Sequence, residues 1–199
     1  MKNNLFILFV LILLIPSSSF SADKQYYFVF LNTNPNREKL SEEETMKLQE
    51  GHLNNINRLA KEGKLITAGP VKGGGGIFIL IASSMDEANE YLQTDPAIKA
   101  NRFNLEVYPM NIAEGNLCKV DSDDFEMVSY TLTRYKGDFV SKDKSKLLIQ
   151  IEFEDINEGI AVFNYDLEKG NMEELNDYFL ADENIYTKTL WIGKGSFCE

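Results

Sequence analysis

Two capping boxes constrain the fold of this chain more than any other feature of its sequence. In each box a serine lies three positions before a glutamate, at the start of a helical pattern: Ser41 with Glu44, and Ser84 with Glu87. Gly63 is predicted to end the first helix, because glycine readily adopts the left-handed conformation that follows a helix. Apolar or alternating segments typical of strands flank both helices, at residues 26–31, 64–71, 77–82 and 102–108.

The order strand, helix, strand, strand, helix, strand predicts an α+β fold, a ferredoxin-like sandwich with a four-stranded antiparallel sheet and both helices on one face. Pro109 is expected to end the fourth strand. In the first helix, four apolar residues recur at helical spacing and are predicted to face the core: Met46, Leu53, Ile56 and Ala60. Leu48, His52 and Leu59 are predicted to lie along the edge of that stripe. The opposite face of the sheet is left bare and needs a cover.

A second, degenerate copy of this pattern follows and supplies such a cover. Residues 76–80 resemble residues 159–163, and the acidic pattern of residues 86–92 resembles that of residues 173–179. Asp182 echoes Asp95, but residues 135–146 are too few and too charged to hold the first helix, so the copy has no equivalent of His52. We expect a single-chain pseudo-dimer built from residues 22–112, an acidic linker at 113–126, and residues 127–199. Chance similarity of two acidic helices, or a homodimer of two chains, is the alternative.

The N-terminus has the pattern of a secretory signal peptide over residues 1–21. Lys2 precedes the apolar run of residues 5–15, and small residues lead to a predicted cleavage after Ser21. We therefore expect a secreted or periplasmic protein that is free of the membrane after cleavage; a retained single-span anchor is the alternative. In an oxidising compartment Cys118 and Cys198, the only two cysteines, are expected to form a disulfide, with two free thiols as the alternative.

Charge and motif content exclude several classes of function. The full chain has a formal charge of −11, and loss of Lys2 with the signal leaves 19 basic and 31 acidic residues, a charge of −12. Such a surface repels phosphate backbones, so nucleic acid is not an expected partner. The glycine run 73–76 is not followed by Lys-Ser/Thr and leads into a strand, unlike a phosphate loop. A single histidine without ligand-spaced partners indicates no metal site, and no cofactor is expected.

His52 and Asp95 are the candidate catalytic residues. His52 is the only histidine, and Asp95 precedes Pro96, which places its carboxylate at the end of the second helix. If Asp95 accepts the proton of one ring nitrogen, the other nitrogen is free to act as a base. The alternatives are a half-buried structural histidine and an ordinary Asp-Pro helix stop. Ser83, with Gly74 and Gly75 of the glycine turn, is a weaker candidate for contacts with a small-molecule ligand.

Several short motifs occur in one order and at characteristic distances: His52-Leu53, residues 62–70 (Glu-Gly-Lys-Leu-Ile-Thr-Ala-Gly-Pro), Ser83, Glu87-Ala88 and Asp95-Pro96. Together they resemble the YCII-related (YciI-like) family over about residues 24 to 112. The resemblance implies a ferredoxin-like fold of the dimeric α+β barrel type, with a histidine and aspartate pair proposed as the active site in a cleft. One branch of that family resembles muconolactone isomerases and includes a dehydrochlorinase acting on a hydroxylated aromatic ring. Most members have no established reaction.

This chain departs from the family at two points. Gln49 stands where many relatives carry a basic residue, which weakens the case for an anionic substrate, and export replaces the usual cytoplasmic setting. Three hypotheses remain. The first is an exported lyase or isomerase-like enzyme with His52 as general base and Asp95 as its orienter. The second is a non-catalytic module that binds a small ligand, and the third is a structural domain.

Overall fold

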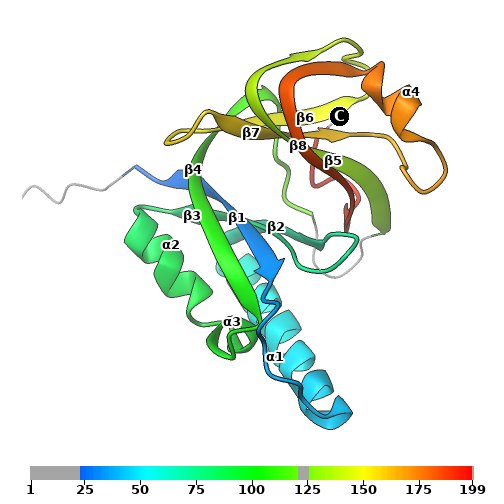
Figure 1. Ribbon diagram of the computed structural model, residues 1–199. Helices are drawn as coiled ribbons and strands as arrows, with labels where there is room; N and C mark the ends of the chain where they lie inside the picture. The colour runs from blue at the N-terminus through cyan, green and yellow to red at the C-terminus, as the bar shows by residue number, and fades with distance from the viewer. Residues whose placement is uncertain (1–22, 121–125, 199) are drawn as a thin grey trace, which may run out of the picture.

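The computed structural model describes residues 23–120 and 126–198 (Figure 1). The first half contains β1 (Gln25–Thr33), α1 (Glu42–Lys61), β2 (Leu65–Pro70), β3 (Gly76–Ala82), α2 (Met85–Leu92), α3 (Pro96–Lys99) and β4 (Phe103–Gly115). The second half contains β5 (Met127–Ser141), β6 (Leu147–Phe153), β7 (Glu158–Phe163), α4 (Met172–Asn176) and β8 (Phe179–Gly193). The predicted signal peptide and residues 121–125 of the predicted linker lie outside the described residues. No helix in the described ranges is long and apolar enough to cross a membrane.

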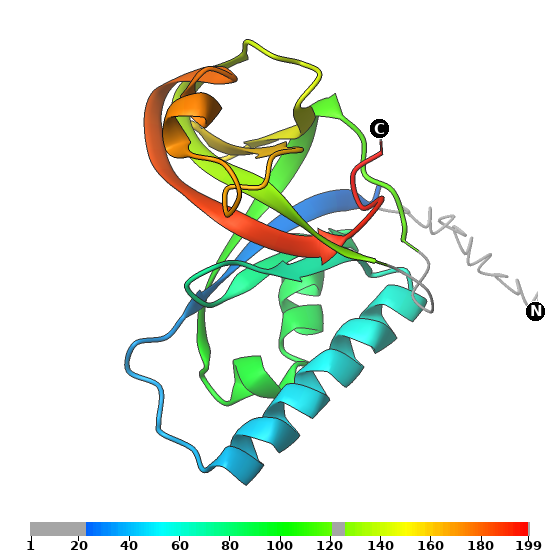
Figure 2. The same ribbon diagram turned by 90° about the vertical axis from the view of Figure 1, so that its right-hand side faces the viewer.

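All eight strands form one sheet with the order β2-β3-β1-β4-β6-β7-β5-β8, and the paired strands are antiparallel. Its first four strands have the order of a ferredoxin-like unit, with helices on one face. The predicted α+β class with an antiparallel sheet is therefore confirmed. The sheet curls so that its two end strands meet (Figure 2). Val71, just after β2, bridges to Leu190 of β8, and the amide of Lys72 donates to the carbonyl of Thr189 over 2.9 Å.

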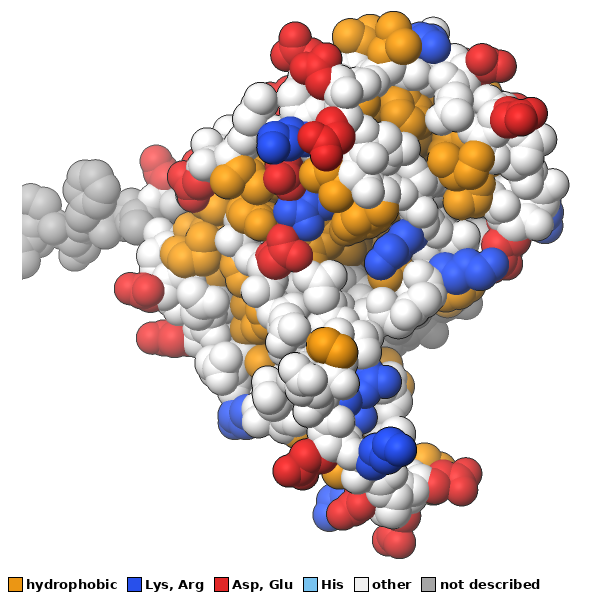
Figure 3. All heavy atoms as spheres, in the orientation of Figure 1, with side chains coloured by type: hydrophobic (Ala, Val, Ile, Leu, Met, Phe, Trp, Pro, Cys, Tyr) orange, Lys and Arg blue, Asp and Glu red, His pale blue; other side chains and the backbone are white. Residues whose placement is uncertain are grey.

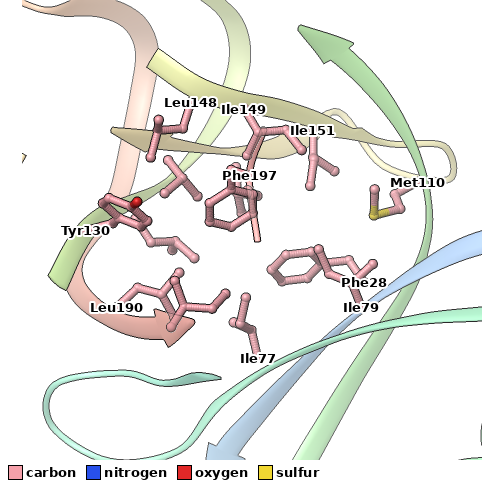
Figure 4. Packing of buried hydrophobic residues seen from close by; sticks show 14 of the residues in the cluster. Phe28, Ile77, Ile79, Met110, Tyr130, Leu148, Ile149, Ile151, Leu190 and Phe197 are labelled. Carbon is pink, nitrogen blue, oxygen red and sulfur yellow. The ribbon is translucent and has the colours of Figure 1, made fainter. Parts of the chain in front are cut away.

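The sheet face without helices in the first half packs against the second half. Phe28 of β1 and Ile79 of β3 point towards Ile149 and Ile151 of β6, and Phe197 of the C-terminal segment lies between them (Figure 4). All five of these side chains are buried. Burial of apolar surface stabilises a fold by roughly 25 cal/mol for each Å² removed from water. Each half therefore stabilises the other.

The disulfide expected from the sequence is present. Cys118, just beyond β4, is bonded to Cys198 near the C-terminus. The amide of Cys118 also donates to Ser196, and that of Cys198 donates to Asn116. The crosslink therefore joins the end of the first half to the end of the second, and it holds the segment that carries Phe197.

The helix-covered face of the first half corrects the predicted α1 stripe. Leu59 and Asn55 of α1 are buried against this face, whereas Met46 and Leu53 are 60% and 49% exposed. The buried side of the helix follows Leu48, His52, Asn55 and Leu59 at spacings of four, three and four residues. Ile56 is partly buried and packs against this core, as predicted, but the prediction was wrong for Met46 and Leu53. It failed there because the buried side includes two polar residues, so the apolar periodicity selected the neighbouring side.

The end of β4 also differs from the prediction. Pro109 does not end the strand, which continues to Gly115 and so includes the first residues of the predicted linker 113–126. Proline lacks only the amide donor, and its carbonyl accepts from the amide of Glu154 over 3.0 Å. Near Met110 the strand changes neighbours, from β1 to β6. Proline is tolerated in the strand where this exchange occurs.

The second half lacks a counterpart of α1. Residues 142–146 between β5 and β6 are all described and contain no helix, and α4 has only five residues. A small apolar cluster covers the outer sheet face instead: Tyr135, Ala161, Phe163, Leu175 and Phe179. β6, which spans Leu147–Phe153, follows the helix-free segment 142–146 directly.

Candidate functional site

The position of His52 is set by the two ends of α1. At the start, Ser41 and Glu44 form the predicted capping box: the Ser41 amide donates to the Glu44 carboxylate over 2.8 Å, and the Glu44 amide donates to Ser41 Oγ over 3.2 Å. At the other end, Gly63 has a φ of 69° and follows the last turn, as predicted. His52 lies midway along the helix, on the side that faces the sheet.

Asp95 begins a third helix that the sequence did not predict. Its Oδ1 accepts from the amides of Ala97 at 2.8 Å and Ile98 at 3.2 Å, which makes it the N-cap of α3, with Pro96 at the first helical position. The predicted place of the carboxylate, at the end of the second helix, is therefore replaced by a place at the start of the next one. The cap fixes the carboxylate and aims Oδ2 at α1.

The structure brings His52 and Asp95 together. Nδ1 of His52 lies 2.7 Å from Oδ2 of Asp95; the Asp95 side chain has no exposed surface and that of His52 is 12% exposed. Gly51 contributes to this approach, because a Cβ at this position would lie 3.1 Å from the ring of Pro96. The absence of a side chain there lets α1 come close to the start of α3.

The protonation of the pair follows from its surroundings. Burial opposes the ionisation of Asp95, but the hydrogen bond and charge of His52 and the amides of Ile98 and Ala97 outweigh it, so the pKa of Asp95 lies below its ordinary value of 3.8. An ionised carboxylate only accepts hydrogen bonds. When His52 is neutral, Nδ1 therefore carries the proton, and Nε2 keeps the lone pair that a base needs.

Two aromatic rings hold the imidazole. The ring of Phe78 on β3 stacks on it at a centroid distance of 5.9 Å and an interplanar angle of 18°, and the ring of Phe103 on β4 lies at 5.9 Å and 40°. With apolar neighbours beside the ring and a buried carboxylate at Nδ1, His52 has a fixed orientation.

The other predicted site residues lie apart from the pair or have structural contacts. Ser83 is five residues beyond Phe78 along an extended segment, roughly 16 Å away, and its hydroxyl donates to Glu87 over 2.5 Å at the start of α2. The hydrogen bonds of Ser83 and Tyr91 lower the pKa of Glu87 to about 2. Gly74 and Gly75 have φ values of 101° and 82° and pack against the end of β1. Their predicted ligand contacts stay predictions.

Sequence reasoning missed the residues that surround Asp95 on its other side. Asn55 Nδ2 donates to Asp95 Oδ2 over 3.3 Å, while Arg58 and Thr94 bind the Asn55 carbonyl oxygen. Asn55 follows His52 by three residues and so lies near it on the helix surface, but nothing in the sequence links Asn55 to Asp95. Within residues 23–120 and 126–198, no three histidine, cysteine, aspartate or glutamate side chains form a group that could hold a metal ion.

Comparison with known proteins gives a family match within the first half of the chain. The family model of the YCII-related domain matches residues 26–111, which include α1, both members of the His52–Asp95 pair and all four strands of the first half up to Asn111. The search of curated proteins gave no match.

Proposed function

We propose that this domain, whose residues 26–111 match the family model of the YCII-related domain, is an acid–base enzyme in which His52 is the general base and Asp95 orients it. One observation carries the proposal: the 2.7 Å contact of His52 Nδ1 with a carboxylate that has no exposed surface. A buried acceptor at Nδ1 leaves Nε2 to take the substrate proton. General base catalysis of this kind contributes roughly 10²–10⁴-fold to a rate.

The proposed step is lyase-like or isomerase-like. Nε2 removes a proton from a carbon next to a carbonyl, or from a phenol, on a small cyclic substrate, and the electron pair of the broken bond forms a new double bond. In an elimination that pair expels a leaving group, and in an isomerisation a second carbon takes the proton back. The resulting imidazolium is stabilised by the Asp95 charge. Neither route calls for a cofactor.

A non-catalytic role is the second candidate, and the low exposure of His52 favours it. Only 12% of the imidazole is accessible, and Phe78 and Phe103 lie against its ring. A histidine in such surroundings also suits a structural domain or a module that binds a small ligand. Catalysis requires a substrate to reach the Nε2 edge of the ring.

Profiling phenols and lactones separates these functions. We expect turnover by the wild-type protein and its loss in His52→Gln, with ligand binding retained. Asn54→Gln, on the exposed side of the same helix, is the matched control and should turn over substrate normally. A ligand that binds the wild-type protein and His52→Gln without turnover by either would favour the binding module. Equal turnover by the two proteins would reject His52 as the base.

We also propose that the chain is a single-chain pseudo-dimer of the dimeric α+β barrel type, with residues 22–112 and 127–199 as its halves. The strand order β2-β3-β1-β4 is followed by β6-β7-β5-β8, which is the same order of second, third, first and fourth strand. The adjacency of β2 and β8 supports a closed barrel. Sedimentation should give the mass of one chain, and a homodimer would give twice that mass.

Export is the third proposal, with residues 1–21 as a signal peptide and a secreted or periplasmic destination. A disulfide between Cys118 and Cys198 supports it, because such bonds persist in oxidising compartments. Mass spectrometry of the exported protein should find Ala22 at its N-terminus.

The expected partner is a small molecule and not nucleic acid or a membrane surface. On the face drawn in Figure 3, acidic side chains are interspersed with basic ones, so that face offers no continuous basic surface.

A further inference from the structure

The surroundings of Asp95 assign a role to Asn55 that goes beyond the pair itself. We infer that Asn55 is a positioning residue: its side-chain amide holds the Asp95 carboxylate in the orientation that binds Nδ1 of His52. The inference rests on the proposed function, since it concerns the same pair. Asn55 is 7% exposed, and its Nδ2 donates to Oδ2 of Asp95, the oxygen that His52 also contacts.

The orientation of the Asn55 amide is determined by its other neighbours. Nη2 of Arg58 lies 2.8 Å from Asn55 Oδ1, and a guanidinium only donates hydrogen bonds. The Thr94 hydroxyl is 2.9 Å from the same oxygen. The carbonyl end of the amide must therefore face Arg58, which leaves the NH2 end for Asp95. Reversal of the amide would place two donors against each other and two acceptors against each other.

Arg58 is in turn held from the surface. Its Nη1 lies 2.7 Å from Oε1 of Glu62, one helical turn further on, and Oε2 of Glu62 is 2.6 Å from Nζ of Lys64. The contacts run from exposed charges through Arg58 and Asn55 to the buried carboxylate. Surface residues at the end of α1 therefore help to orient a group at its middle.

The structure also shows why Asp95 needs this second donor. Its Oδ1 is fixed by two backbone amides, whereas among the described residues only His52 and Asn55 hold Oδ2. A buried carboxylate with an unfilled acceptor is costly. Without Asn55, opening of the His52–Asp95 contact would cost less, and the proton on Nδ1 would exchange with solvent more often.

The single histidine makes the test direct, since one imidazole gives one set of NMR signals. We would measure the ¹⁵N shifts of His52, which report the tautomer, and the solvent exchange rate of the Nδ1 proton. The wild-type protein should show an Nδ1–H tautomer with a protected proton. Asn55→Leu, similar in size but without a donor, should accelerate exchange by about tenfold, the factor that matches one lost hydrogen bond to a charged group.

Matched variants guard the interpretation. Asn54→Leu and Asn57→Leu change exposed asparagines of the same helix and should leave exchange unchanged. Arg58→Met keeps Asn55 but removes one of the two donors to its carbonyl oxygen, and it should also accelerate exchange; it provides the test should Asn55→Leu fail to fold. Exchange within about twofold of wild type in Asn55→Leu and Arg58→Met would overturn the inference while leaving the pair intact. An unprotected Nδ1 in the wild-type protein would instead overturn the proposed function together with the inference.

Discussion

The Asp95 carboxylate accepts four hydrogen bonds, two at each oxygen. Oδ1 starts α3 through the amides of Ala97 and Ile98, and Oδ2 binds His52 and Asn55. One side chain thus connects the start of a helix with the orientation of the imidazole. A substitution at Asp95 tests both roles, and an asparagine there separates them because asparagine also caps helices well.

Asp95→Asn should destabilise the protein by about 1–3 kcal/mol at pH 7, since its amide can cap α3 but would present a donor to the Nδ1 proton. The difference from wild type should also depend on pH. Because folding lowers the pKa of Asp95, its contribution is full above the unfolded value of 3.8 and is lost as the pH falls through the lower folded value. Urea unfolding followed by Trp191 fluorescence, between pH 7 and pH 3, measures this. Asp155→Asn, in an exposed turn, is the control; a pH-independent difference would contradict the expectation.

At the scale of elements, features set by local chemistry could be predicted from the sequence, whereas features that depend on contacts between distant residues could not. Both helix starts were predicted because Ser41 and Ser84 each accept a hydrogen bond from the backbone amide three residues further on. Only the first capping box is complete, since the Glu87 carboxylate accepts from the amide of Ser83 and not from that of Ser84. Part of the α1 stripe was misread because the buried side of the helix contains Asn55 and His52, which both contact Asp95 at the start of α3. Pro109 was misread because its tolerance depends on a carbonyl contact with the β6–β7 turn. The pairing of His52 with Asp95 was predicted through family resemblance, whereas the support from Asn55 requires knowledge of three dimensions.

Two glycines in the turn between β2 and β3 allow the cost of backbone strain to be measured separately from the cost of steric overlap. Gly73 and Gly75 both have positive φ values, 95° and 82°; a Cβ on Gly73 meets nothing within 4 Å, but one on Gly75 would overlap the carbonyl oxygen of Leu31. We expect Gly73→Ala to cost about 1 kcal/mol from conformation alone, and Gly75→Ala to cost about 2–3 kcal/mol because β1 must also shift. Urea midpoints of the two variants test this. Equal costs would show that the turn moves away from β1 freely.

At the scale of the whole molecule, the two halves share a charged contact as well as a core. Arg134 of β5 is 8% exposed and pairs with Glu106 of β4 at 3.0 Å and with Glu158 of β7 at 2.7 Å. Its guanidinium also lies over the ring of Phe30, at 4.5 Å. One residue of the second half therefore neutralises a carboxylate of each half and covers an aromatic ring of the first.

Arg134→Met should destabilise the protein by about 3 kcal/mol, because it leaves two partly buried carboxylates without their cation. Lys136→Met, on the same strand but exposed, should change stability by less than about 0.5 kcal/mol. Raising the salt concentration should not restore the loss, since a buried pair is screened weakly. Comparable urea midpoints for the two variants would show that the core alone holds the halves together.

The disulfide acts on the same association from the end of the chain. Cys118 and Cys198 are 80 residues apart, and closing a loop of that length stabilises the folded state by about 4 kcal/mol, mainly by restricting the unfolded chain. The double variant Cys118→Ser, Cys198→Ser should lose about that much stability, measured by urea unfolding.

If the bond acts only on the unfolded chain, Phe197 stays packed and amide exchange of residues 195–198 barely changes in the folded variant. If the bond also holds the C-terminal segment in place, the amide exchange of residues 195–198 becomes faster in the double variant. Phe197→Ala in the oxidised protein should still destabilise it by about 3–5 kcal/mol, because the substitution leaves a cavity in the shared core. A double variant as stable as the wild type would mean that the bond does not form in solution, which would also remove the structural support for export.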